Sequence, residues 1–168
     1  MKVKMGKNVI LFLGGGAMAG VFGAGIVTKL QEENFYSEIK AICGSSAGVF
    51  NMAYFLSKQS KLGSSIYWEN LQKHFIYPKK GIPGFFERFW NLYIHKLPRR
   101  KILSVTNIDY LIDVAKYKKV LDINALRKNS VYGVARIYDI ENNKIKYKDL
   151  KKNTFQVLRE ATSVIPYY

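Results

Sequence analysis

The pentapeptide Gly44-x-Ser46-x-Gly48 is the part of this sequence whose residue types and spacing could do chemistry. Residues 39–43 before it are predicted to form a short strand, and residues 49–58 after it are typical of a helix. A sharp turn between them would expose the Ser46 hydroxyl at the carboxyl end of a sheet, near helix N–H groups that favour a developing negative charge. The pattern therefore predicts Ser46 as a nucleophile and the two glycines as the residues that keep the turn tight. The alternative is a serine that only caps a helix.

A second glycine cluster, formed by Gly14, Gly15 and Gly16, follows the apolar run of residues 9–13. That run is predicted to be a parallel strand, and neighbouring strands in a sheet lie about 5 Å apart. The turn after it should therefore lie beside the turn that carries Ser46. Glycines leave backbone N–H groups free to face a substrate oxygen, so the cluster is a candidate oxyanion hole. Together the two turns predict a site for acyl transfer.

Two phosphate-binding folds also use glycine-rich turns after a first strand. The spacing Gly14-x-Gly16-x-x-x-Gly20 approximates a dinucleotide-binding fingerprint, but that fold needs an acidic residue at the end of the second strand. Here the second strand ends at residues 42–44, which read Ile-Cys-Gly. A P-loop is excluded because no Gly-Lys-Ser/Thr follows the glycines. Acyl transfer is therefore the preferred interpretation.

The hydroxyl of Ser46 needs a base to activate it. The histidines, His74 and His95, precede all the aspartates, so they do not follow the order Ser, Asp, His of a triad. We expect both to be packing or surface residues, which leaves a serine–carboxylate dyad. No candidate carboxylate lies in a glycine-flanked turn after a strand. The candidates are Asp109, Asp113, Asp122, Asp139 and Asp149.

The elements that must position these residues alternate between strand and helix. Residues 19–33 are small and apolar at first and charged at the end, which predicts a helix between the two strands. The resulting unit of about fifty residues indicates a parallel sheet and an α/β fold. Further helices are predicted at 64–75, 107–116 and 154–162, and a short one at 122–128 that is capped by Asp122. A hairpin is predicted at 131–140 and 145–147.

Size and charge favour one folded domain with anionic partners. The chain has 168 residues, of which 48% are hydrophobic and 23% charged. Its net charge of +15 favours acidic proteins, nucleic acid or a membrane with anionic headgroups. The lysines are scattered, however, as on a solvated surface, and no motif for reading nucleic acid accompanies them. We therefore expect no nucleic-acid partner.

Cysteine and histidine content limits the chemistry further. The single cysteine, Cys43, allows no disulfide within the chain and favours a cytoplasmic site of action. One cysteine and two histidines argue against a zinc site.

The start of the chain has one feature of a signal peptide or membrane span, because residues 8–28 carry no charge and follow three lysines. Six glycines lie within this stretch, and each costs a helix about 1 kcal/mol. The glycines argue against both interpretations.

The two glycine motifs resemble those of the patatin-like phospholipases, especially the bacterial-type members. The likeness rests on residues 13–20, which read Leu-Gly-Gly-Gly-Ala-Met-Ala-Gly, on Gly25, and on residues 44–48. It is strongest over residues 7–56 and weaker beyond them. The paired motifs at this spacing are fairly specific.

This resemblance implies a three-layer α/β/α fold with a mainly parallel sheet. It also implies hydrolysis of fatty-acyl esters of phospholipids or neutral lipids by a Ser–Asp dyad, without a metal or other cofactor. The resemblance assigns the nucleophile to Ser46, and it assigns the oxyanion loop to Gly14, Gly15, Gly16 and Ala17.

The sequence departs from the family pattern in two places. Ala19 stands where members commonly carry a basic residue. The family's catalytic Asp lies in an Asp-Gly-Gly or Asp-Gly-Ala turn, a few dozen residues after the segment that resembles residues 163–166, and this sequence contains no Asp-Gly dipeptide. We therefore expect residues 1–168 to form a single domain that is incomplete before the catalytic-Asp strand and that hydrolyses esters poorly by itself. A naturally short, inactive homologue is the alternative.

Residues 81–101 combine large aromatic side chains with a basic end at Arg99, Arg100 and Lys101. Such a segment suits either peripheral contact with an anionic membrane or a core helix with a basic end. The expected partner is an acyl-ester lipid. The second functional hypothesis is a homologue of the same fold that binds lipids or anions without catalysis.

Overall fold

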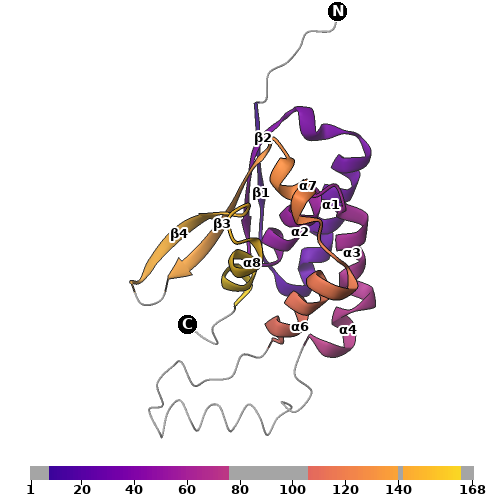
Figure 1. Ribbon diagram of the computed structural model, residues 1–168, viewed down its shortest axis with the longest axis vertical. Coiled ribbons are helices and arrows are strands. Elements are labelled where there is room, and N and C mark those ends of the chain that lie inside the picture. Colours follow the sequence, from indigo (N-terminus) through magenta and orange to yellow (C-terminus); the bar gives the residue numbers. More distant parts are fainter. Residues whose placement is uncertain (1–7, 76–105, 140–141, 164–168) are drawn as a thin grey trace, which may run out of the picture.

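A computed structural model of the protein describes residues 8–75, 106–139 and 142–163 (Figure 1). The predictions for residues 81–101, including His95, lie outside these ranges. One four-stranded sheet organises the described residues. In spatial order its strands are β1 (Val9–Leu13), β2 (Ile39–Ser45), β3 (Tyr132–Asp139) and β4 (Lys144–Asp149).

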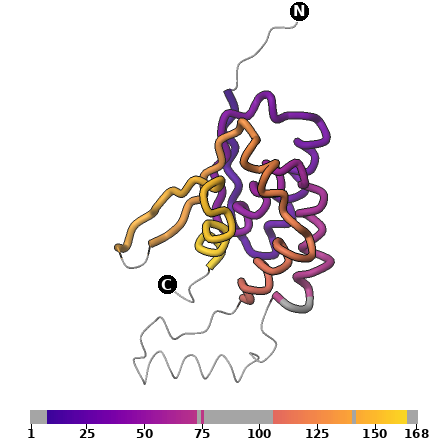
Figure 2. The backbone as a smooth tube through the Cα atoms, viewed as in Figure 1, coloured from indigo at the N-terminus to yellow at the C-terminus, as the bar shows by residue number. Residues whose placement is uncertain are grey.

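The sheet is mainly parallel. Strands β1, β2 and β3 run in the same direction, with Leu13 opposite Gly44 and Gly44 opposite Ala135. The first two strands therefore end side by side, which is what the sequence predicts for the two glycine turns. Strand β4 returns antiparallel to β3, so the predicted hairpin is confirmed, and it projects from the body of the molecule (Figures 1 and 2).

Helices pack around this sheet. The longer ones are α1 (Gly20–Glu32), α2 (Ala47–Leu56), α3 (Ser60–Glu69), α6 (Ile108–Asp113), α7 (Ile123–Lys128) and α8 (Thr154–Thr162). Shorter helical segments are η1 (Ala17–Ala19), η2 (Phe35–Ser37), α4 (Leu71–His74) and the π-helical η4 (Val114–Lys118). Figure 1 shows α1, α2 and α3 together beside the strands. The predicted α/β fold with a mainly parallel sheet is confirmed, and the arrangement is consistent with a three-layer α/β/α architecture.

Helix α2 lies at the centre of the core. Every residue from Gly48 to Leu56 is buried, because α2 packs on β2 on one side and against α1, α3 and α8 on others. This position explains why its sequence is apolar on all sides. The sheet residues that face the helices, such as Leu13, Ile42 and Ala135, are buried as well. By contrast, Ile10 and Phe12 point to the opposite face and are exposed.

The predicted helix at residues 64–75 is wrong in its boundaries. Helix α3 begins at Ser60, and Asn70 separates it from α4. Gly63 lies in the first turn of α3, although glycine weakens a helix. The structure supplies the reason for this glycine, because a Cβ at Gly63 would lie 2.4 Å from Cγ of Tyr54 on α2. Close packing of the two helices therefore overrides the local preference.

The predicted helix at residues 107–116 is also modified, because α6 ends at Asp113 and continues as the π-helical η4. The shorter helix at 122–128 is confirmed together with its cap, since the Asp122 carboxylate accepts a hydrogen bond from the Ala125 N–H (2.8 Å). None of the described helices combines the length and the apolar character that crossing a membrane requires.

Candidate active site

Ser46 joins β2 directly to α2 with an unusual backbone conformation. Its φ of 50° and ψ of −123° lie where residues other than glycine are rare, and such conformations cost about 1–3 kcal/mol. Val49 N–H donates to the Ser46 carbonyl oxygen (2.9 Å), which starts the first turn of α2. The Ser46 hydroxyl makes no hydrogen bond to the N–H groups of α2, a helix that the structure describes completely. Ser46 is the N-cap residue of α2, but its side chain does not cap the helix, and its hydroxyl lies at the positive end of the helix dipole.

Close backbone packing enforces this turn. A Cβ at Gly48 would lie 2.1 Å from the carbonyl oxygen of Leu13 at the end of β1. A Cβ at Gly44 would lie 3.0 Å from the backbone of Gly48 and Val49. The first turn of α2 thus rests directly on the ends of β1 and β2, at a distance that excludes larger residues.

The glycine loop after β1 is exposed and follows a left-handed course. Gly16 has a φ of 144° and Ala17 a φ of 48°, and the Ala19 N–H donates to the Gly16 carbonyl oxygen (2.9 Å) to close a tight turn. Nothing lies within 4 Å of the position that a Cβ on Gly14 would take. The loop therefore presents its backbone to solvent rather than to the protein core.

The structure brings the glycine loop and the serine turn into contact. A Cβ at Gly15 would lie 2.8 Å from Cβ of Ser46 and 3.6 Å from its Oγ. The first distance is shorter than real Cβ atoms allow, so only glycine permits this approach. Because a Cβ lies about 1.5 Å from its Cα, Ser46 Oγ is within about 5 Å of the Gly15 Cα.

A buried hydrogen-bonded pair holds the beginning of α1 next to this contact. The Asn51 side-chain amide donates to the Gly20 carbonyl oxygen (2.9 Å), and the Tyr67 hydroxyl donates to the Asn51 side-chain oxygen (3.0 Å). Burial raises the pKa of Tyr67 to about 12, so its hydroxyl stays a donor. Sequence reasoning missed this pair, although Asn51 interrupts an otherwise apolar helix, which is a signal for a buried polar contact.

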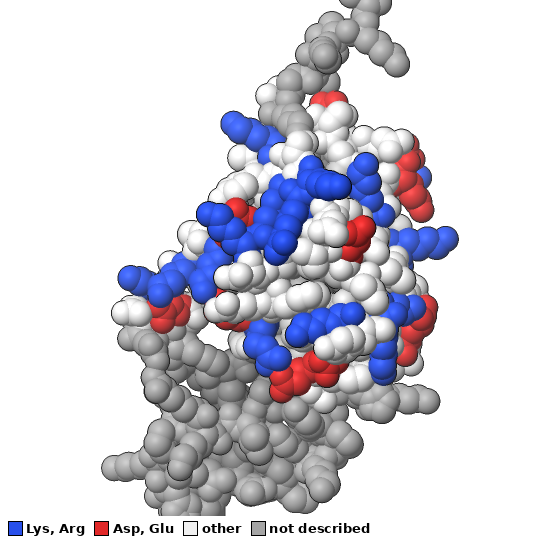
Figure 3. Space-filling view, in the orientation of Figure 1, with Lys and Arg blue, Asp and Glu red and all other residues white. Residues whose placement is uncertain are grey.

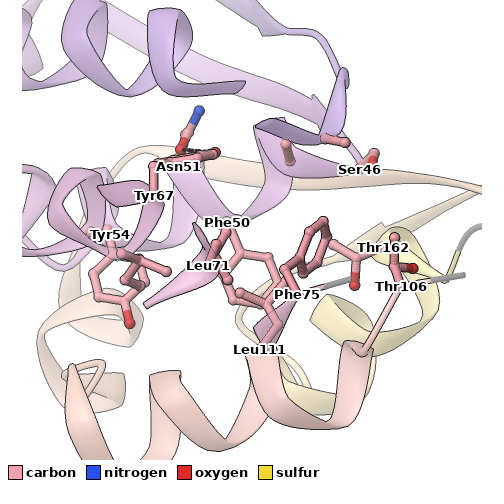
Figure 4. A pocket seen from close by; sticks show the side chains of 14 residues that line it. Ser46, Phe50, Asn51, Tyr54, Tyr67, Leu71, Phe75, Thr106, Leu111 and Thr162 are labelled. Atoms are coloured by element: carbon pink, nitrogen blue, oxygen red, sulfur yellow. Dashed lines mark hydrogen bonds between the residues drawn. The ribbon is translucent and has the colours of Figure 1, made fainter. Parts of the chain in front are cut away.

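A pocket opens at Ser46 and extends between the helices (Figure 4). It contains about 520 Å³ of empty space, part of which is open to solvent. Figure 4 shows Ser46 at one end and Tyr54 at the other, with Phe50 and Leu71 between them. The lining is mostly apolar and consists of Ala17, Ser46, Ala47, Phe50, Asn51, Tyr54, Gly63, Ile66, Tyr67, Leu71, Phe75, Thr106, Leu111 and Thr162.

None of the candidate aspartates lines the pocket beside Ser46. Four of the five aspartates form hydrogen bonds or ion pairs away from the pocket. At one of them, Asp139, the Lys146 ammonium and the Asn142 amide lower the pKa to about 2. His74 is the last residue of α4, and its side chain lies outside what the structure describes. The partners are Arg159 for Asp109, the Ala125 N–H for Asp122, Lys146 and Asn142 for Asp139, and the Lys151 N–H for Asp149, whereas Asp113 is exposed.

The described residues also offer no cluster of three or more His, Cys, Asp or Glu side chains that could hold a metal ion. The pocket lining likewise carries no charged side chain. What this part of the chain brings together is a strained serine, a loop of exposed amides and an apolar cavity.

Comparison with known proteins agrees with this arrangement. Residues 11–166 match the family model described as patatin-like phospholipase, which covers both glycine turns and nearly the whole chain. No curated protein matches the chain significantly. The family is one of lipid hydrolases, and its model spans all the residues that form the pocket. The chain therefore belongs to the patatin-like phospholipase family.

Proposed function

We propose that the protein is a serine hydrolase of fatty-acyl esters in which Ser46 is the nucleophile. The observation that carries the proposal is the contact of Gly15 with Ser46 at the mouth of an apolar pocket. In the reaction, Ser46 Oγ attacks the acyl carbonyl carbon, its proton passes to a carboxylate base, and the alcohol leaves with a proton. Water then cleaves the acyl–serine ester and releases a fatty acid.

The oxyanion that forms during this attack needs donors on the loop side of Ser46. Gly14, Gly15, Gly16 and Ala17 supply exposed backbone there, and the N-terminus of α2 adds its dipole. We propose their N–H groups as the oxyanion hole. Gly44 and Gly48 would serve this chemistry indirectly, by letting α2 and the strands approach closely enough to hold Ser46 in place.

The base is proposed to be an aspartate that forms a dyad with Ser46. No carboxylate in the described part of the chain lines the pocket, and the sequence contains no Asp-Gly dipeptide. We therefore expect this chain alone to hydrolyse esters slowly or not at all. We also propose a cytoplasmic site of action, because the single cysteine, Cys43, is free and forms no disulfide within the chain.

Peripheral contact with an anionic membrane is the second part of the proposal. Met18 on η1 and Phe22 and Ile26 on α1 are exposed at intervals of four residues, directly after the glycine loop. Such an apolar stripe beside the mouth of the pocket suits a lipid surface. Lysine and arginine side chains are spread over the face seen in Figure 3, with acidic residues among them, so attraction to anionic lipid would be general rather than confined to one patch.

Vesicle flotation tests this contact. Phosphatidylcholine vesicles with and without phosphatidylglycerol should carry the protein upward, more strongly with the anionic lipid. Phe22→Ser should reduce flotation, whereas Tyr117→Ser should not, although Tyr117 is equally exposed (74% against 77%). Equal flotation of the two variants would contradict a role for α1.

The competing function is lipid or anion binding without catalysis, and it is favoured because none of the described carboxylates lines the pocket beside Ser46. A fluorophosphonate probe separates the two. The hydrolase proposal predicts an adduct on Ser46, located by peptide mass spectrometry and absent in Ser46→Ala. Retained fatty-acid binding without an adduct would favour the non-catalytic homologue. Fast turnover of p-nitrophenyl butyrate that Ser46→Ala abolishes would instead contradict the expected weak activity and point to one of the five aspartates.

A further inference from the structure

The pocket at Ser46 has a closed far end. The pocket-lining residues of α2 are spaced three or four positions apart, so the cavity follows one face of this helix. They are Ala47, Phe50, Asn51 and Tyr54. Tyr54 is 1% exposed and stands at the end opposite Ser46 (Figure 4). The length of the cavity is therefore set by the eight residues that separate Ser46 from Tyr54.

Tyr54 is fixed at both ends of its side chain. Its hydroxyl donates to the Lys119 carbonyl oxygen (2.5 Å), which follows the π-helical segment. Its ring packs on Gly63 so closely that a Cβ there would lie 2.4 Å from Cγ of Tyr54. A ring held between a backbone carbonyl and a helix backbone cannot swing aside to lengthen the cavity.

The polar side chains of the wall are already engaged. Asn51 is bonded to Gly20 and Tyr67, and the Thr162 hydroxyl donates to the Leu158 carbonyl oxygen (2.8 Å). Away from Ser46, these groups already have hydrogen-bond partners within the protein. The cavity therefore fits a plain hydrocarbon tail.

From this geometry we propose that the pocket accepts an acyl chain of limited length, about ten carbons, and that Tyr54 sets the limit. Eight helical residues rise about 12 Å. An extended backbone spans about 3.5 Å over three bonds, or about 1.2 Å per bond, so the same distance holds about ten bonds. The proposal rests on the proposed function, because it takes Ser46 as the point where the acyl carbonyl lies.

Binding of unbranched fatty acids tests the limit without requiring catalysis. The affinity of the full chain for sodium alkanoates from four to sixteen carbons is measured by calorimetry, at concentrations below those at which the fatty acids aggregate. Each added CH₂ should raise the affinity about fourfold while it is buried, and the increase should stop near ten carbons. A steady increase to sixteen carbons, or no binding at any length, would overturn the proposal.

Two variants and a control locate the limit. The chain length at which the affinity stops increasing is called the break. Tyr54→Leu should shift the break to longer chains, and Leu71→Phe, which fills the middle of the cavity, should shift it to shorter ones. Leu62→Phe makes the latter substitution on α3 outside the lining and should leave the break in place. If Tyr54→Leu does not fold, the comparison of Leu71→Phe with Leu62→Phe still tests the proposal. A break at the same chain length in these two variants would contradict it.

The outcome is separable from that of the proposed function. A break near ten carbons without a fluorophosphonate adduct would support the chain-length limit and count against hydrolysis. An adduct on Ser46 with no break in the alkanoate series would support hydrolysis and count against the chain-length limit.

Discussion

Residues 8–75 and the later described residues, 106–139 and 142–163, contribute unequally to the site. The first region supplies Ser46, the glycine loop that touches it and most of the pocket wall. The second region closes the pocket with Thr106, Leu111 and Thr162 and carries all five aspartates, none of which lines it. The contact between the glycine loop and Ser46 depends on the backbone alone, so one strand–helix–strand–helix unit is enough to form it. A base for Ser46 would have to come from a residue far away in the sequence, and no local sequence pattern identifies that residue.

The two regions also differ in how they are held together. Around Ser46, backbones pack at distances that only glycine allows. In the β3–β4 hairpin, by contrast, side chains on the two strands are joined by partly exposed ion pairs such as Lys146 with Asp139. Close packing is costly to disturb, and exposed ion pairs contribute little. Substitutions should therefore have graded effects, from large in the first region to small in the second.

The largest effect is expected for Gly48→Ala. Its Cβ would meet the Leu13 carbonyl oxygen at 2.1 Å, so we expect a loss of about 3 kcal/mol or more in the free energy of unfolding. Gly25→Ala is the matched control, because nothing lies within 4 Å of its added Cβ, and alanine should stabilise α1 by up to about 1 kcal/mol. Urea unfolding measures both, and equal stability of the two variants would contradict the packing argument.

Asn51→Leu should be the next most damaging change. It leaves the Gly20 carbonyl and the Tyr67 hydroxyl without their partner in a buried place, at a cost of about 2 kcal/mol or more. Tyr67→Phe removes only one hydrogen bond and should cost about 1 kcal/mol. Because Gly20 follows the glycine loop, Asn51→Leu should also slow labelling of Ser46 by a fluorophosphonate. A variant as stable and as reactive as the wild type would show that the pair does not brace the loop.

A smaller effect is expected at the hairpin, where Asp139 titrates. The Lys146 ammonium and, next, the Asn142 amide lower the pKa of this carboxyl to about 2 from 3.8. The folded protein therefore binds this proton more weakly than the unfolded chain does. The stabilisation is present above pH 3.8 and is lost as the pH falls toward 2. Lys146→Gln should raise the pKa of Asp139 in an NMR titration, whereas Lys144→Gln on the same strand should not.

The smallest effect is expected for the aspartates as candidate bases. Replacing each of the five by asparagine, one at a time, should leave the rate of Ser46 labelling unchanged, because none lines the pocket. Activity-based labelling followed over time checks this. Collapse of the rate in a single variant would identify the base and would remove the contrast between the two regions.

Sequence was sufficient where local interactions decide the structure. The strand Val9–Leu13 and the helix Thr154–Thr162 have their predicted boundaries, and Asp122 caps its helix as expected. The contact of the two glycine turns also followed from the spacing of strands in a parallel sheet. In these cases each residue's own preference agrees with its tertiary surroundings.

Sequence was insufficient where distant residues decide. Helix α3 begins at Ser60 rather than at residue 64, and Gly63 within it packs against Tyr54 on another helix, which local sequence does not reveal. The bond between Asn51 and Gly20 spans 31 residues, so no local pattern reveals it. The pocket combines residues from five helices, which sequence periodicity does not assign to one another.

The backbone of Ser46 has a consequence for stability as well as reactivity. Its φ of 50° and ψ of −123° mirror an ordinary extended conformation, which glycine adopts without penalty. A chain selected for thermal stability alone would carry glycine there. Under the proposed function, keeping the serine side chain at this position gives up some stability for reactivity. The Ser46→Ala variant would keep the strained backbone conformation at residue 46, whereas Ser46→Gly would relieve the strain. The two inactive proteins should therefore melt at different temperatures, the glycine form at the higher one.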